Sequence, residues 1–224
     1  MTRFEHTTEV ASGDWIAPRL RGAFGAVGRV CPTGYEAYAR IFHPVGEARA
    51  AWADVCAETG RTPHALMQWH DVSRPVDAAG QEPWRDPPPT GTLGAESLAV
   101  LAAAVGGDAA MTIGLWYGYG FPYPHPEPTL VLPMREYVLY RGRLATLRDP
   151  GWAEKHGWSW AGGRMPNLAW PDDRSWFVAS EIDFYSTVIG GSRLLVERVL
   201  SSGLEAAEVT AASDLSSEGD RINR

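Results

Sequence analysis

Two carboxylates two positions apart are the strongest candidates for chemistry in this sequence. Glu181 and Asp183 lie in the stretch ASEIDFYS, which is typical of a β-strand, and residues two apart in a strand point to the same side. Two like charges held close together raise the pKa of one carboxyl, as general acid/base chemistry requires. The alternative is a polar face on a half-exposed sheet, because Ile182 and Phe184 alternate with the acids.

Aromatic residues offer a different kind of site. The chain has ten tryptophans, five of which lie between residues 152 and 176. Large rings with a polar handle suit sugar rings, flat ligands and partner proteins. The candidate ligand-binding residues are Tyr119, Phe121, Tyr123, His125, Trp158, Trp160, Trp170 and Arg174. The alternative is that the rings form a small core that holds long loops against a sheet.

The stretch GLWYGYGFPYPH, residues 114–125, combines both possibilities. Its first half continues a strand, so alternation predicts Leu115 and Tyr117 on one face and Trp116 on the other. From Gly118 onward it reads as a loop stiffened by proline.

No motif specifies a metal, a cofactor or a nucleophile. His64 and His70 are six positions apart and lack the spacing of an HExxH pair. Cys31 and Cys56 belong to no CxxC pair, and their redox state is left open. No GxSxG stretch is present. We therefore expect neither a metal nor a cofactor.

Composition narrows the class of partner. The 224 residues carry a formal net charge of −7 without a basic stripe, which argues against a nucleic-acid partner. No apolar run approaches the roughly 20 residues that a membrane helix needs. The polar N-terminal stretch lacks the apolar region of a signal peptide, so we expect a cytoplasmic protein without a membrane partner. A protein or a small-molecule ligand remains as the partner.

The elements that must position these residues fall into two halves. Helices are predicted over 32–44, 46–60, 95–105 and, capped by Ser192, over 192–203. Strands are predicted over 111–118, 129–142, 175–191 and, at an edge, 205–211. This order predicts an α+β fold: a mostly antiparallel sheet with N-terminal helices and a C-terminal helix packed on one face. Residues 1–210 are predicted to form a single domain, and residues 211–224 a disordered tail.

Several stretches resemble those of a known group. GDWIAPRL, PTGYEAYARIFHP, LMQWH, PMREYVLYRG and WPDDRSWFVASEIDFYSTVIGGS together resemble an uncharacterised family of actinobacterial hypothetical proteins, over roughly residues 13–200. The resemblance implies an actinobacterial origin and a single domain. It implies no function, cofactor or catalytic residue.

Two functions from different classes follow. The first is a non-catalytic soluble binding or protein-interaction domain that uses its aromatic-rich loops. The second is a small-molecule enzyme of hydrolase type, with Glu181 and Asp183 as its acid/base pair.

Overall fold

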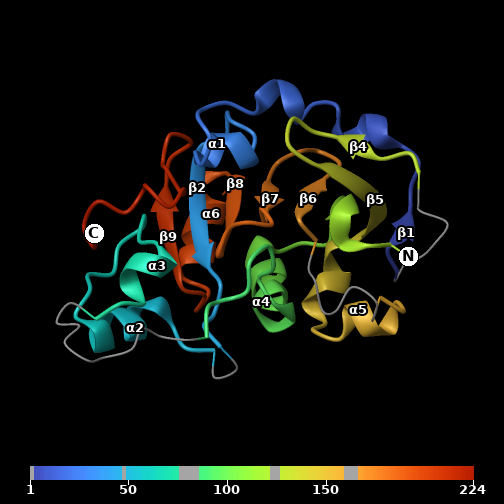
Figure 1. The fold of residues 1–224 in the computed structure, drawn as a ribbon. Helices are drawn as coiled ribbons and strands as arrows, with labels where there is room; N and C mark the ends of the chain where they lie inside the picture. Colours follow the sequence, from blue (N-terminus) through green and yellow to red (C-terminus); the bar gives the residue numbers. More distant parts are fainter. Residues whose placement is uncertain (1–2, 47–48, 76–85, 122–126, 159–165) are drawn as a thin grey trace.

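Nine strands form one antiparallel sheet in the computed structural model, which describes residues 3–46, 49–75, 86–121, 127–158 and 166–224 (Figure 1). The order across the sheet is β1-β5-β3-β6-β7-β8-β2-β9, and β4 also pairs with β5. The strands are β1 (Glu5–His6), β2 (Ala37–Phe42), β3 (Ala110–Trp116), β4 (Leu130–Val131), β5 (Glu136–Arg143), β6 (Leu168–Pro171), β7 (Phe177–Ala179), β8 (Ser186–Gly191) and β9 (Ala206–Val209). The predicted α+β class with a mostly antiparallel sheet is confirmed.

The helices are short. They are α1 (Val27–Val30), α2 (Trp52–Thr59), α3 (Trp69–Val72), α4 (Ala95–Val105), α5 (Trp152–Lys155) and α6 (Arg193–Leu200), with 3-10 turns η1 (Val10–Gly13), η2 (Ala17–Arg19), η3 (Tyr117–Tyr119) and η4 (Leu144–Arg148). None of the helices in the described residues is long and apolar enough to cross a membrane.

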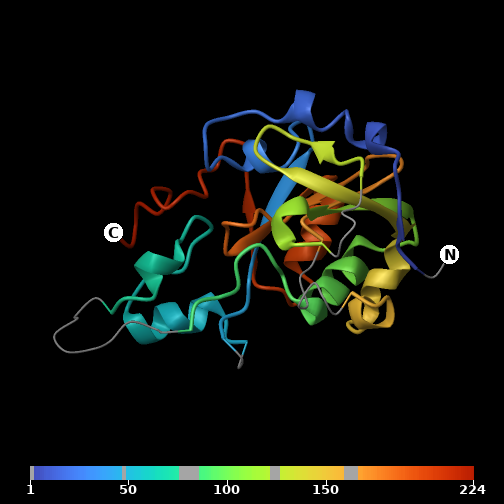
Figure 2. The ribbon, with the colours of Figure 1, turned by 45° about the vertical axis from the view of Figure 1, so that its right-hand side comes forward.

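Both faces of the sheet are buried, because strand residues of opposite parity belong to two different apolar clusters. Figure 2 shows helices on one side of the sheet and the N-terminal segment on the other. On the first face α4, α5 and α6 pack against strand residues such as Ile113 and Ile189. On the second face the segment 10–33 packs against strand residues such as Leu139 and Phe177. Each large aliphatic or aromatic side chain buried in this way contributes about 1.5–3 kcal/mol.

The expectation that the helices pack on one face is not confirmed. Val27 of α1 belongs to the cluster on the second face. Helices α2 and α3 form a third cluster with Phe42, at the end of β2. The longer helices α4 and α6 share one cluster, as expected.

The predicted helix over 32–44 is wrong, because residues 37–42 form β2. Tyr35, Tyr38, Ala39 and Phe42 have helical spacing, but β2 lies between β8 and β9 and all six of its residues are buried. A strand buried on both faces shows no alternation of apolar and polar residues, so its sequence does not distinguish it from a helix.

The predicted helix over 46–60 forms only from Trp52 onward. Its end is as predicted, since Gly60 adopts the left-handed conformation, with a φ of 73°. Its start is capped from a distance: the Glu205 carboxylate accepts hydrogen bonds from the backbone N–H groups of Trp52 at 2.6 Å and of Ala53 at 2.8 Å. The predicted helix 95–105 and the Ser192 cap of α6 are confirmed.

Residues 211–224, expected to form a disordered tail, instead lie against the body of the protein. The backbone N–H of Leu215 donates to the carbonyl of Gly25 at 2.8 Å, and Leu215 is buried in the cluster of the second face. Asp220 and Asn223 are also buried. The tail therefore helps to cover the sheet.

Candidate functional site

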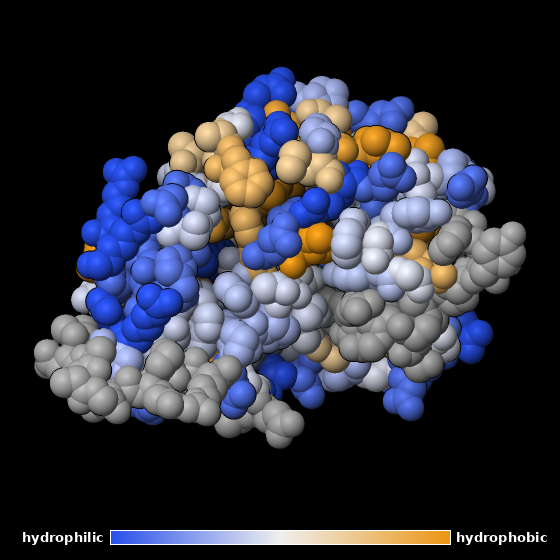
Figure 3. Space-filling model, viewed as in Figure 1, coloured by the Kyte–Doolittle hydropathy of each residue, from blue (hydrophilic) through white to orange (hydrophobic). Residues whose placement is uncertain are grey.

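An apolar groove opens on the second face of the sheet, where three loops meet. Its walls come from residues 20–30, from residues 132–135 between β4 and β5, and from residues 180–184 between β7 and β8. Its apolar lining includes Leu20, Phe24, Val30, Leu132, Met134 and Phe184. Figure 3 shows apolar side chains gathered on the upper part of this face, around α1 and interleaved with hydrophilic ones. The cavity volume of the groove is about 50 Å³, below the roughly 300–1,000 Å³ of typical small-molecule pockets.

Hydrogen-bonded turns fix two of these walls. Leu132 and Arg135 exchange backbone hydrogen bonds across the β4–β5 turn, at 2.9 and 3.3 Å. The N–H of Phe184 donates to the carbonyl of Glu181 at 2.9 Å, which closes the turn after β7. Gly91 packs behind that turn with a φ of 66°, and a Cβ at this position would lie 2.7 Å from the Cα of Ile182. Only glycine tolerates both the conformation and the close approach.

One arginine holds both candidate carboxylates. Arg135 Nη2 donates to Glu181 Oε1 at 3.0 Å and to Asp183 Oδ2 at 2.7 Å, and the guanidinium lies over the ring of Trp116. The prediction that the two acids lie in a strand is wrong, because they occupy the turn between β7 and β8. They nevertheless line the same groove. Since a shared cation offsets their mutual repulsion, the arrangement lacks the like-charge contact that separates an acid from a base.

A second arginine lines the groove without a partner. Within the described residues the side chain of Arg29 makes no hydrogen bond or ion pair, although it lies in the lining beside Phe24 and Val30. The groove thus presents one unpaired cation together with the Arg135, Glu181 and Asp183 cluster.

A chain of buried hydroxyls lies behind the groove and ends at Ser180, which lines it. His43 Nδ1 contacts the Pro89 carbonyl at 2.7 Å, so Nδ1 must carry the proton. His43 Nε2 then accepts from Thr187 Oγ1 at 2.9 Å, and Thr187 Oγ1 accepts from Ser180 Oγ at 2.6 Å. The direction of donation is therefore fixed from Ser180 to Pro89.

This chain is suited to positioning and not to catalysis. Burial lowers the pKa of His43 to about 4, so its imidazole is neutral and a weak base near pH 7. A general base works best when its pKa lies near the working pH. The contacts instead tie the loop before α4 to β8 through Pro89 and Thr187. Sequence reasoning missed this role, because no spacing relates His43 to Ser180 and Thr187.

The structure does not bring the aromatic candidates together. Trp158 is buried on the first face with Phe4 and Trp152, whereas Trp170 is buried on the second face against Phe177. Phe121 is also buried on the first face. These three rings therefore pack the interior.

The other described members of that set, Tyr119 and Arg174, have different neighbours. Tyr119 is half-buried, and its hydroxyl oxygen lies 2.9 Å from Asn167 Nδ2, which donates to it. Arg174 is exposed and lies over the ring of Trp15, with 5.4 Å from its Cζ to the ring centroid. Tyr123, His125 and Trp160 lie outside the described residues.

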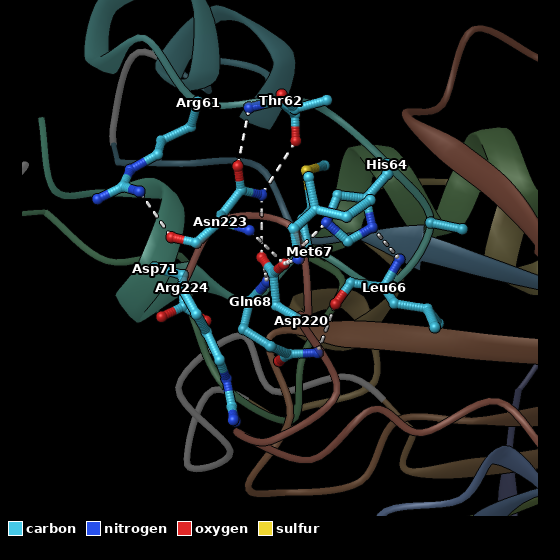
Figure 4. A network of polar contacts seen from close by, with 12 residues as sticks. Arg61, Thr62, His64, Leu66, Met67, Gln68, Asp71, Asp220, Asn223 and Arg224 are labelled. Atoms are coloured by element: carbon cyan, nitrogen blue, oxygen red, sulfur yellow. Dashed lines mark hydrogen bonds and ion pairs between the residues drawn. The ribbon is translucent and has the colours of Figure 1, made fainter. Parts of the chain in front are cut away.

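The densest polar network lies elsewhere, where the C-terminal residues meet the loop before α3 (Figure 4). Asp220 Oδ1 accepts from His64 Nε2 at 2.9 Å and from the N–H groups of Ile222 and Asn223. Asp220 Oδ2 accepts from Gln68 N and from Asn223 Nδ2. Despite burial, which raises it, these hydrogen bonds hold the pKa of Asp220 down, at about 2.

This network also lies near a buried cation. Arg40 is 1% exposed, donates from Nη1 to the carbonyls of Ala65 and Met67, and has Asp220 as the acid whose charge favours its ionised form. His64 has both ring nitrogens occupied, because its Nδ1 accepts from the N–H of Leu66. The contacts of Asp220, His64 and Asn223 therefore form a structural clamp, whereas Oδ2 of Asp71, in the same view, is buried without a hydrogen-bond partner among the described residues.

Metal and thiol chemistry find little support in the described residues. No group of three or more His, Cys, Asp or Glu side chains there is placed to hold a metal ion. Cys31 and Cys56 are buried free thiols, and burial raises the pKa of both, that of Cys56 to about 11. A thiol with a raised pKa is a poor nucleophile.

No protein-family model, curated protein or solved structure matches this chain. A proposal for its function therefore depends on the geometry of the groove.

Proposed function

We propose that this protein is a non-catalytic interaction protein that binds its partner through the apolar groove. The observation that carries the proposal is an apolar groove with Phe24 exposed at its edge and the unpaired Arg29 in its lining. Contiguous exposed apolar surface rimmed by polar residues marks protein interaction sites and ligand-binding grooves. The small volume favours a side chain as the group that is bound.

The groove replaces the aromatic loops as the proposed binding surface. Of the eight tryptophans in the described residues, six are buried and two, Trp15 and Trp116, are half-buried. A surface of presented rings would need exposed ones.

Binding of 8-anilinonaphthalene-1-sulfonate tests the groove, because this probe combines apolar rings with a sulfonate that Arg29 could pair. We expect the native protein to enhance the probe's fluorescence. Met134→Asp and Arg29→Gln should each weaken the apparent affinity about fivefold or more, as expected for the loss of about 1 kcal/mol.

The matched control is Leu194→Asp, which changes a side chain of α6 that is 63% exposed, away from the groove. It should leave probe binding unchanged. Equal probe binding by all four proteins would contradict the groove as a binding site.

A hydrolase-type enzyme is the second candidate, and one observation favours it. Glu181 and Asp183 line a concave site with an arginine between them. An acid/base pair needs one carboxyl that keeps its proton near neutral pH. Carbon-13 NMR of the two carboxyls across pH 3–8 tests this: a proton retained above pH 6 supports the enzyme, and two carboxylates ionised by pH 5 reject it.

A further inference from the structure

The surface around the groove carries both a projection and a hollow. Phe24 is 73% exposed and Met134 is 49% exposed, and both line the groove. Val131, which precedes Leu132 of the groove wall, is 66% exposed. The other exposed large apolar side chains of the described residues, Val100, Leu194 and Ile222, lie outside the groove lining. Of the six exposed large apolar side chains in the described residues, two thus line the groove and Val131 lies next to its wall in sequence.

Charge at this surface is also of both signs. Arg29 contributes one unpaired positive charge, whereas Arg135 with Glu181 and Asp183 sums to +1 − 2 = −1. Asp183 reaches furthest into solvent, with 66% of its side chain exposed. Arg29 and Asp183 form no ion pair with each other within the chain, so each can pair with a group from outside.

A surface of this kind is complementary to itself. In a two-fold symmetric contact the same patch meets its own copy, so a projection must face a hollow and a cation must face an anion. Two copies of a chain with net charge −7 repel each other at most surfaces. The charged groups that line the groove sum to zero, so a contact at this face adds no local like-charge repulsion between two copies.

Other occupants fit less well. A strongly acidic segment would meet Glu181 and Asp183, and a strongly basic one would meet Arg29. The cavity volume of about 50 Å³ is also small beside the roughly 300–1,000 Å³ of typical cofactor and ligand pockets.

We infer that the partner of the groove is a second copy of this chain, in a two-fold symmetric dimer. Phe24 of each copy covers the apolar groove of the other, and Arg29 of each copy pairs with Asp183 of the other. This inference depends on the proposed function, since it names the partner of the same groove.

Sedimentation equilibrium from about 1 to about 200 µM protein tests the dimer. We expect the native chain to associate reversibly. Phe24→Asp should weaken association more than about 30-fold, as for a central aromatic contact. Because Phe24 is largely exposed, this variant should keep the native near-ultraviolet circular dichroism. Leu194→Asp, on α6, is the control that should still dimerise.

A charge exchange tests the pairing of the two subunits. Arg29→Glu alone and Asp183→Arg alone each place two like-charged contacts in a homodimer and should weaken it about tenfold. An equal mixture of the two variants forms a heterodimer in which both contacts join opposite charges. The mixture should therefore associate nearly as tightly as the native chain.

Three results would overturn the inference. A native chain that stays monomeric up to the highest concentration overturns the dimer, and probe binding then decides independently whether the groove is a binding site at all. If Phe24→Asp leaves the dimer intact, the groove is not the dimer contact. A mixture no tighter than its components overturns the pairing of Arg29 with Asp183.

Discussion

His43 and its hydroxyl partners show how a single buried polar residue constrains its surroundings. Thr187 donates to His43 and accepts from Ser180, and His43 donates to the Pro89 carbonyl and accepts from Thr187, whereas Ser180 only donates. Thr187 stands in the middle, so its hydroxyl serves two partners at once. Removing it should therefore cost more than removing the terminal Ser180.

Thr187→Val should lower the free energy of unfolding by about 2–4 kcal/mol, because it leaves His43 Nε2 without a donor and Ser180 without an acceptor. Ser180→Ala, the matched control, leaves only one lone pair of Thr187 unused and should cost about 1 kcal/mol. Urea unfolding at pH 7 measures both. Equal losses would contradict the role of Thr187 as the group that serves two partners.

His43 should also make the free energy of unfolding depend on pH. Its pKa is about 4 in the folded protein against an ordinary value of 6.5, so the unfolded chain takes up the proton first as the pH falls. Stability should therefore decline by about 3 kcal/mol between pH 6.5 and pH 4. In urea unfolding curves, the free energy of unfolding of His43→Gln should change little between pH 6.5 and pH 4. If it declined as steeply as that of the native protein, His43 would not be the group responsible.

Asp220 should make stability depend on pH in a lower pH range than His43 does. Its pKa is about 2 in the folded protein against an ordinary 3.8, so it stabilises the fold above pH 4 and loses that contribution as the pH falls to 2. The loss should be about 2 kcal/mol. Asp220→Asn should be less stable at pH 7 and should lack the decline between pH 4 and pH 2, which acid-dependent thermal unfolding measures.

At the scale of the elements, sequence predicts best where the signal is local. Gly60 at the end of α2 and Ser192 at the start of α6 are found where their residue types predict them. Leu115 and Tyr117 pack on one face of the sheet and Trp116 on the other, as alternation predicts. These features depend on neighbours within a few positions.

Features that depend on distant contacts could not be predicted. Glu205 sets the start of α2 across more than 150 positions, and no local pattern at residues 46–52 indicates it. The groove joins three loops, and only Glu181 and Asp183 among its lining residues were candidates from sequence. Tryptophan content did not distinguish binding surface from core, since a ring suits both.

The contribution of the Glu205 cap to the stability of α2 can be tested by mutation. Glu205→Ala should lower the free energy of unfolding by about 1–2 kcal/mol, because two N–H groups at the start of the helix lose their acceptor. Glu208→Ala is the matched control, since Glu208 is exposed and pairs only loosely with Arg193 at 3.5 Å. It should change stability by less than about 0.5 kcal/mol. The cap assignment fails if the two variants unfold at the same urea concentration.

At the scale of the whole molecule, segments distant in sequence complete one another. The C-terminal residues cover the second face of the sheet and supply the acid near Arg40. Removal of the C-terminal residues is therefore expected to expose buried residues of the sheet.

Deleting residues 214–224 should destabilise the protein by more than about 3 kcal/mol, because it exposes the face under Leu215 and leaves Arg40 without a nearby acid. Thermal unfolding followed by circular dichroism measures the effect. Ile222→Ser, which alters a side chain 59% exposed in the same segment, should unfold near the native temperature. A deletion variant that is as stable as the native chain would show the segment to be dispensable.

The position of β2 in the sheet bears on how the chain folds during its synthesis. β2 ends at residue 42, yet its two neighbours, β8 and β9, begin at residues 186 and 206. At the usual 5–20 residues per second, the ribosome needs roughly 7–30 s to reach the first of them. Until then both hydrogen-bonding edges of a mostly apolar strand are open, and such edges recruit other chains. The nascent protein is therefore expected to depend on chaperones that shield residues 37–42 until the C-terminal quarter has emerged.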